Sequence, residues 1–154
     1  MSLRSWRIAK RKHAGEAFTG KGAREYGGRW NSPGVTMVYT AEHASLAILE
    51  VLVHLGGAQL LPDYVLFGVE FDEALAEAVD EAALPEGWRA FPAPVSLRPI
   101  GDQWVGEGRS AVLSVPSAVL PLERLFLLNP QHPDFPSIRI GDAQPFPLDR
   151  RLKR

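Results

Sequence analysis

The chain has 154 residues, no cysteine, and a formal charge of −1 from 17 Lys and Arg against 18 Asp and Glu. This length fits one domain, and 45% hydrophobic with 23% charged residues is typical of a globular protein, which excludes wholesale disorder. The lack of cysteine excludes a disulfide framework and a thiolate site, and it fits a cytoplasmic protein. The sequence has no run of eighteen apolar residues and no apolar signal core, so we expect neither a membrane span nor secretion.

Periodicity and chain breakers predict the elements in order. The 14 Gly and 13 Pro favour short elements joined by shaped loops. We expect a strand at 35–40 and then a helix at 41–55, with Thr40 as its N-cap and Gly56-Gly57 as its stop. A strand at 64–71 and an acidic helix or loop at 72–83 should follow. The rest of the chain predicts a helical turn at 101–108 and short strands at 111–115, 125–128 and 138–140. The fold class is therefore α+β, in a single domain spanning 1–154 whose last residues, 150–154, form a flexible basic tail.

Charge is segregated along the chain. Residues 1–30 contain eight Lys and Arg against two Glu, whereas residues 63–87 contain eight acids and no base. The basic region can meet an anion such as phosphate, or it can be ordinary solvated surface. Because aromatic residues do not alternate with these bases and no nucleic-acid motif is present, we expect no direct nucleic-acid binding by this chain.

The 41–55 helix carries one carboxylate among apolar residues. Its apolar side chains cover nearly all sides, so we expect a buried central helix. Glu50 lies between Leu46 and Val53 on a helical projection, where a charge is costly unless it is paired or functional. A buried ion pair with an N-terminal arginine and a catalytic role are both open at this point. His43, Glu50 and His54 lack the spacing of a zinc motif, and we expect no metal.

The segment 20–31 is rich in glycine and basic residues. Glycines let backbone N–H groups approach an anion, and Arg29 adds a bidentate fork suited to phosphate. The segment is neither a Walker loop nor a dinucleotide fingerprint, because Gly-Lys-Ser/Thr is missing and a strand follows it. A phosphate-binding loop and a flexible surface loop fit it equally well.

A series of motifs extends along nearly the whole chain. They are Trp6-Arg7-Ile8, Gly27-Gly28-Arg29-Trp30-Asn31-Ser32-Pro33-Gly34, Val38-Tyr39-Thr40-Ala41-Glu42-His43, Ala47-Ile48-Leu49-Glu50-Val51-Leu52-Val53-His54, Leu84-Pro85-Glu86-Gly87-Trp88, Gly101-Asp102-Gln103-Trp104, Val115-Pro116-Ser117-Ala118 and Asn129-Pro130-Gln131-His132-Pro133-Asp134-Phe135. In residue types and in order, these motifs resemble the RES-domain family.

This resemblance implies a fold like that of the ADP-ribosyltransferase toxins, with NAD⁺ as substrate. It also implies a toxin of a bacterial toxin–antitoxin pair, held in an oligomeric complex by an Xre-type helix-turn-helix antitoxin. The family's catalytic set maps onto Arg29, Tyr39 and Glu50, and its substrate-binding set adds Arg7 and Ser117.

The implied roles follow the chemistry of cleaving the nicotinamide–ribose bond. Glu50 would hold the ribose and stabilise an oxocarbenium-like state, and Tyr39 would stack on nicotinamide. Arg29 and Arg7 would clamp the diphosphate, and Ser117 would hydrogen-bond the nicotinamide amide or the ribose. From residue chemistry alone, Tyr39 could equally be an aromatic residue of the core. By the same reasoning, the Ser117 hydroxyl could simply cap the backbone of a turn.

Three functions remain open from the sequence. The first is a toxin that depletes NAD⁺ by hydrolysis or phosphorolysis. The second transfers ADP-ribose to a cellular protein, and no recognition loop in the sequence decides between the two. The third is a non-catalytic module that binds nucleic acid or a protein partner.

Overall fold

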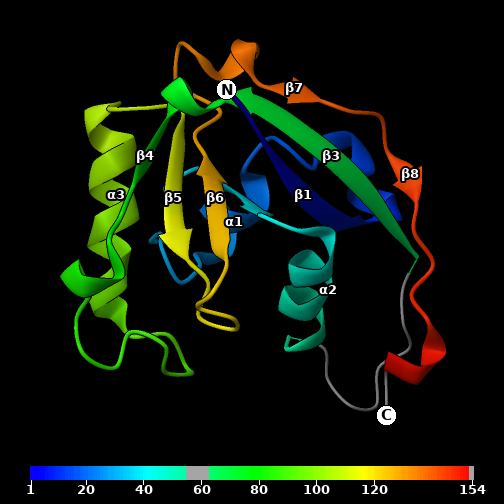
Figure 1. Ribbon diagram of the computed structural model, residues 1–154, viewed down its shortest axis with the longest axis horizontal. Coiled ribbons are helices and arrows are strands. Elements are labelled where there is room, and N and C mark those ends of the chain that lie inside the picture. The colour runs from blue at the N-terminus through cyan, green and yellow to red at the C-terminus, as the bar shows by residue number, and fades with distance from the viewer. Residues whose placement is uncertain (55–62, 153–154) are drawn as a thin grey trace.

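The computed structural model describes residues 1–54 and 63–152, and in them strands and short helices form a mixed α+β domain (Figure 1). The α+β class predicted from the sequence is confirmed. The strands are β1 Ser2–Lys10, β2 Val38–Ala41, β3 Tyr64–Asp72, β4 Ala76–Ala78, β5 Val112–Pro116, β6 Arg124–Leu128, β7 Arg139–Ile140 and β8 Gln144–Pro145, and the α-helices are α1 Lys21–Tyr26, α2 Ala44–Leu52 and α3 Arg98–Glu107.

The sheet consists of two groups of strands that diverge from one another. Its order is β4-β5-β6-β2-β1-β3-β7, with β8 also paired to β3. β1 and β3 pair along their whole lengths, from Ser2 opposite Asp72 to Lys10 opposite Tyr64. β1 meets β2 at one residue pair, Trp6 opposite Ala41. Figure 1 accordingly shows β1 and β3 running at a steep angle to β5 and β6.

The strand β1 is missing from the sequence prediction. Charged side chains obscure the alternation of polar and apolar residues that would predict this strand. Arg4, for example, lies opposite Glu70 of β3 and forms an ion pair with it at the surface. Ser5 is fully buried, and its hydroxyl oxygen lies 2.8 Å from that of Thr40. The buried hydroxyl of Ser5 thus has its hydrogen-bond partner on the neighbouring strand β2, and the local sequence around Ser5 does not reveal that partner.

The helix α2 starts later than predicted. Thr40 belongs to β2 and donates its hydroxyl to the carbonyl of Phe126 at 2.7 Å, so its assignment as N-cap is wrong. The N-cap position is occupied by His43, and the predicted stop at 56–57 lies outside the described residues. The strand predicted at 35–40 is correspondingly displaced, because pairing with β6 extends from Val38 to Ala41.

Burial of α2 is limited to one face. Leu46 and Ala47 are buried against the sheet, whereas Leu49 is 40% exposed and Val53 is 54% exposed. The helix lies at the margin of the divergent strands and packs on β1 and β2. The expectation that apolar residues on all sides would bury the whole helix is therefore wrong for its outer face.

The remaining predictions agree with the structure in kind. β3, β5 and β6 coincide with the predicted strands, and α3 lengthens the expected helical turn by three residues at its start. The acidic segment 72–83 forms two 3-10 turns around the short strand β4, and 150–152 is also a 3-10 turn. In the described part of the chain no helix is long and apolar enough to cross a membrane.

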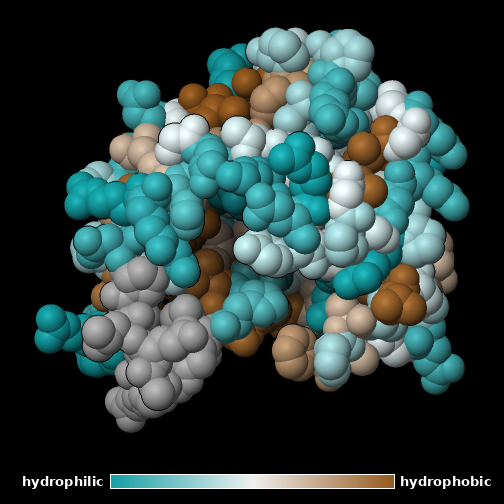
Figure 2. Space-filling view, turned by 180° about the vertical axis from the view of Figure 1, so that it is seen from behind, coloured by the Kyte–Doolittle hydropathy of each residue, from teal (hydrophilic) through white to brown (hydrophobic). Residues whose placement is uncertain are grey.

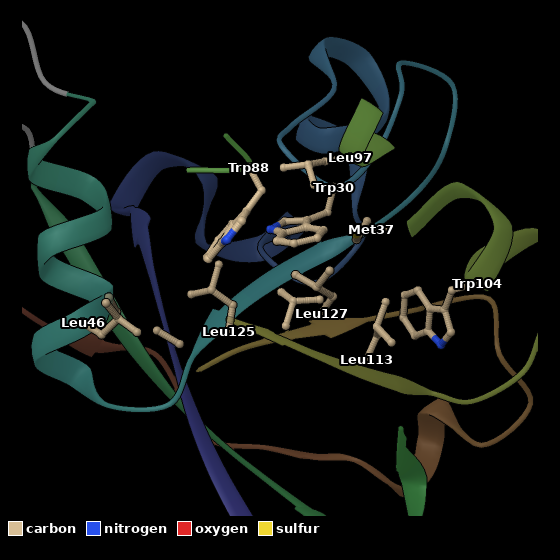
Figure 3. Packing of buried hydrophobic residues seen from close by; sticks show 12 residues of the cluster. Trp30, Met37, Leu46, Trp88, Leu97, Trp104, Leu113, Leu125 and Leu127 are labelled. Carbon is tan, nitrogen blue, oxygen red and sulfur yellow. The ribbon is translucent and has the colours of Figure 1, made fainter. Parts of the chain in front are cut away.

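The main core is built around tryptophans. Trp30 and Trp104 are fully buried, and Trp88 nearly so, with the Trp30 and Trp88 rings 6.3 Å apart. Figure 3 shows Trp104 beside Leu113 of β5, and Trp30 between Trp88 and Met37. Because Trp30 follows Arg29 directly, this packing fixes the backbone of the glycine-rich segment to the sheet.

Candidate active site

A large cavity lies where α1, α2 and the 88–93 loop face one another. Its volume is about 840 Å³, within the range of small-molecule binding sites. Figure 2 shows a hollow with hydrophobic atoms in its floor and mostly hydrophilic residues around it. Its charged lining residues are four bases and two acids, namely Arg7, Lys21, Arg29, Arg89, Glu16 and Glu50.

A second cavity of about 490 Å³ adjoins the first. Both cavities are lined by Arg7, Tyr39, Glu50, His54 and Leu125. The second is otherwise bounded largely by β1, which supplies Trp6 and Ile8 among others. Arg7, Tyr39 and Glu50 thus face a cleft with two chambers, at the place where β1 and β2 separate.

Arg7 spans the gap between these strands. Its Nε donates to the carbonyl of Ala17 at 2.6 Å and its Nη1 to the carbonyl of Tyr39 at 2.9 Å. Burial lowers its pKa to about 10, so it remains a cation at neutral pH. A buried cation held by neutral carbonyls leaves a positive charge available to an anion in the cleft.

Tyr39 is anchored through its hydroxyl. The phenol donates to Oδ1 of Asn31 at 2.6 Å and accepts from the backbone N–H of Trp30 at 3.1 Å. Burial raises the pKa of Tyr39, so its phenol is neutral at neutral pH. Its side chain contributes to both chambers while the hydroxyl is held on the glycine-rich segment.

Arg29 lines the larger cavity and is anchored on the 88–93 loop. Its Nη1 donates to the carbonyls of Trp88 and Ala90, both at 2.9 Å, which fixes the 88–93 loop over the cleft. Burial lowers its pKa, and the negative charge of Glu50 opposes that shift. Nε and Nη2 of Arg29 have no protein partner among the described residues, and they remain available for a ligand.

Glu50 is held in place from the adjacent loop. It lies in the last turn of α2, half-buried, and its Oε1 accepts a hydrogen bond of 2.8 Å from the Ser117 hydroxyl. Ser117 is fully buried, and its oxygen also accepts from the backbone N–H groups of Val119 and Leu120. One carboxylate oxygen of Glu50 is thereby oriented while the side chain lines the cleft.

Replacing Ser117 by alanine should lower both activity and stability. The change frees Glu50 and removes the partner of two backbone N–H groups, at a cost of about 1–3 kcal/mol in unfolding free energy. We expect turnover to fall about 10- to 100-fold through misorientation of the carboxylate. Ser114→Ala is the matched control, because Ser114 is also buried and hydrogen-bonded, but its hydroxyl oxygen accepts from Arg124 and does not contact Glu50. Equal turnover in the two variants at matched folded fractions would contradict this role.

The sequence-predicted residues meet at one place. Arg7, Arg29, Tyr39 and Glu50 all line the larger cavity, and Ser117 stands behind Glu50. Direct contact of Ser117 with a substrate stays a prediction, while the geometry favours action through Glu50.

A base missed in the sequence also belongs to the lining. Arg89 donates to the carbonyl of Ala118 at 3.0 Å and lines the larger cavity. Nothing local distinguishes it from other surface bases, so only the tertiary fold could find it. Lys21, which belongs to the glycine-rich segment 20–31, lines the same cavity.

The two histidines considered with Glu50 are far from forming one cluster. His54 lines the cleft, whereas His43 pairs with Glu123 at 3.0 Å at the other end of α2. That pair raises the pKa of His43. Among residues 1–54 and 63–152, no group of three His, Asp or Glu side chains is arranged to hold a metal ion.

The fold and the site together define a protein with a mixed sheet and a cleft in which basic side chains surround the Glu50 carboxylate. The family model for the RES domain matches residues 4–149. The chain therefore belongs to the RES-domain family.

Known proteins similar to this chain are named as toxins. A protein of Yersinia enterocolitica named Toxin Res is 38% identical over 150 residues, which cover 96% of this chain and 98% of the relative. A Sphingobium protein named Prs ADP-ribosylating toxin is 39% identical over 159 residues, covering 100% and 99%. In fold, the chain resembles a solved structure of the M. tuberculosis MbcT–MbcA toxin–antitoxin complex, with a TM-score of 0.76, 18% identity, and coverage of 95% of this chain and 85% of that one.

Proposed function

We propose that this protein is the toxin of a toxin–antitoxin pair and that it cleaves the nicotinamide–ribose bond of NAD⁺. The observation that carries the proposal is the Glu50 carboxylate, fixed by Ser117 in a cleft that also contains Arg7, Arg29 and Tyr39. The names of the relatives support the toxin role.

The charges of the cleft suit a dinucleotide. NAD⁺ carries two negative charges on its diphosphate and one positive charge on its nicotinamide ring. Arg7 and the free Nε and Nη2 of Arg29 can donate to phosphate oxygens, and the rest of the Arg29 fork is already fixed on loop carbonyls. Because these donors are preorganised, little side-chain entropy is lost when the diphosphate binds.

The carboxylate suits the bond that breaks. Cleavage breaks the bond between ribose C1′ and the nicotinamide nitrogen, whose electron pair leaves with neutral nicotinamide. Positive charge develops on the ribose, and Glu50 stabilises it as it forms. In hydrolysis a water oxygen bonds to C1′ and releases a proton, giving ADP-ribose; in phosphorolysis a phosphate oxygen bonds there instead.

Tyr39 offers an aromatic wall beside this centre. Its neutral ring lies between the two chambers, where it can pack against the nicotinamide ring. The hydroxyl is engaged by Asn31 and Trp30, so the ring is held and the phenol is not the proton donor in this scheme.

An antitoxin is the partner that this function requires. We propose an Xre-type helix-turn-helix protein that neutralises the toxin in an oligomeric complex in the cytoplasm. The similarity of fold to the toxin of a solved toxin–antitoxin complex and the absence of cysteine from the chain support this proposal. Co-expression of the adjacent reading frame tests it: rescue of growth and co-purification are expected, and failure of both would refute it.

The activity is tested by incubating the purified protein with NAD⁺, with and without phosphate, and quantifying nicotinamide and ADP-ribose products. We expect stoichiometric release of nicotinamide. Unchanged NAD⁺, with or without cell lysate, would refute the proposed chemistry. Dependence on phosphate separates phosphorolysis from hydrolysis.

A second candidate is transfer of ADP-ribose to a protein. It is favoured by the relative of 39% identity whose name describes an ADP-ribosylating toxin. The same cleft would bind NAD⁺, and a nucleophile of the target would replace water at C1′. Labelled NAD⁺ in lysate distinguishes the two, because transfer leaves label on a discrete protein whereas hydrolysis leaves it on free ADP-ribose.

A further inference from the structure

Asn31 is the most highly connected polar side chain beside the cleft. It is fully buried, and its Nδ2 lies within hydrogen-bond distance of three backbone carbonyls, at 2.9 Å from Ala23, 3.1 Å from Ser32 and 3.1 Å from Val35. Its Oδ1 accepts from the Tyr39 hydroxyl at 2.6 Å. A buried side chain that uses both ends of its amide in this way ties several backbone segments together.

The segments that Asn31 joins are those that shape the cleft. The carbonyl of Ala23 belongs to α1, and those of Ser32 and Val35 lie on the chain leading into β2. The backbone carbonyl of Asn31 also accepts from the N–H of Gly28 at 3.0 Å, which closes a tight turn around Arg29. Arg29 and Tyr39 are thus both set by bonds to one residue.

Close packing leaves this arrangement little freedom. A Cβ on Gly28 would lie 2.6 Å from the Tyr39 hydroxyl oxygen and 3.0 Å from Oδ1 of Asn31, so the backbone of the turn lies directly against the bonded pair. On the far side Asp102 of α3 accepts from the backbone N–H of Ser32 at 2.8 Å and from its hydroxyl at 2.6 Å. The turn is therefore held between α3 and Tyr39.

We propose that Asn31 is a positioning residue of the active site, which sets Tyr39 and Arg29 relative to Glu50 without touching the substrate. Its part in turnover rests on the proposed NAD⁺ cleavage, whereas its hold on Tyr39 does not. Asn31 does not line either cavity, so it acts through the residues that do.

The test uses Asn31→Ala in the full chain with ¹³C-labelled tyrosine. The chain has three tyrosines, and Tyr64 of β3 serves as the internal reference, because Tyr26 lies in α1, which Asn31 contacts through the Ala23 carbonyl. We expect the Tyr39 ring resonance, identified by Tyr39→Phe, to shift or broaden while that of Tyr64 stays. With NAD⁺, kcat should fall by up to about 100-fold, a larger factor than the rise in KM.

Asn129→Ala is the matched control, because Asn129 is also buried in a loop and caps backbone through its Oδ1, but its bonds to Gln131, Ala111 and His132 reach no residue that lines either cavity. It should lose stability without loss of kcat. If Asn31→Ala does not fold, Tyr39→Phe removes the same bond from the other side, and full activity there would overturn the proposal.

Two further outcomes distinguish failure of the proposed NAD⁺ cleavage from failure of the proposed role of Asn31. An inactive wild type refutes the NAD⁺ chemistry, and the Tyr39 resonance then still decides the positioning role. An active wild type with an unshifted Tyr39 resonance and unchanged kcat in Asn31→Ala overturns the role of Asn31 alone.

Discussion

Replacing Glu50 by glutamine should lower the rate of NAD⁺ cleavage by about 10²- to 10³-fold. Glutamine keeps the length of the side chain and can accept the same hydrogen bond from Ser117, which is 2.8 Å long in the native protein. What it loses is the negative charge that faces the developing oxocarbenium ion. We therefore expect kcat to carry most of the effect, measured as nicotinamide released at saturating NAD⁺.

Glu42→Gln is the matched control for this variant. Glu42 precedes the same helix and also accepts a hydrogen bond, from the backbone N–H of Arg124 at 2.9 Å, but it does not line the cleft. It should retain wild-type turnover. An active Glu50→Gln protein would show that the carboxylate is structural, and the proposed mechanism would be wrong.

Gly101→Ala should have the largest effect on stability. A Cβ at Gly101 would lie 1.9 Å from the backbone carbonyl oxygen of Trp30 and 2.8 Å from the Met37 methyl group. Backbone cannot rotate away as a side chain can, so α3 must move from the tryptophan core. We expect a loss of about 3 kcal/mol or more in unfolding free energy, and a Tm lower by roughly 6–12 °C in thermal denaturation.

Gly106→Ala tests the same chemical change in the same helix. No atom outside the helix lies within 4 Å of a Cβ built there, so alanine should be neutral or stabilise by up to about 1 kcal/mol. A Tm for Gly101→Ala equal to that of Gly106→Ala would show that α3 and the Trp30 segment are not in direct contact. Because Trp30 adjoins Arg29, loss of activity should accompany the loss of stability in Gly101→Ala.

Local pattern was sufficient for part of the fold. The apolar runs of β3, β5 and β6 are each mostly buried, so their composition alone predicts them. β1 escaped prediction because Arg4, Ser5 and Arg7 interrupt its apolar pattern, and each is satisfied by another part of the chain: Glu70, Thr40 and the carbonyls of Ala17 and Tyr39. Secondary structure that depends on such long-range partners cannot be derived from a local window.

The candidate site shows the same division. Its members were predicted from motif resemblance, which reflects the types and order of residues along the chain. Their mutual geometry was not predictable, because it depends on the single β1–β2 residue pair beyond which the strands diverge and leave a cleft. Arg89 and Asn31 were missed as site residues for this reason: one is a surface base by composition, the other a turn residue by pattern.

The sequence by itself determined an α+β fold without cysteine, a near-neutral charge that conceals a basic N-terminal region, and membership in the RES-domain family. Only the tertiary structure decided that three of those N-terminal bases, Arg7, Lys21 and Arg29, line the larger cavity with Glu50, while Arg4 pairs at the surface. The physical reason is that burial and charge pairing depend on neighbours distant in the chain. The outer face of α2 is an example of this dependence. Its side chains Leu49 and Val53 are apolar, but they stay exposed because no other part of the described chain packs over them.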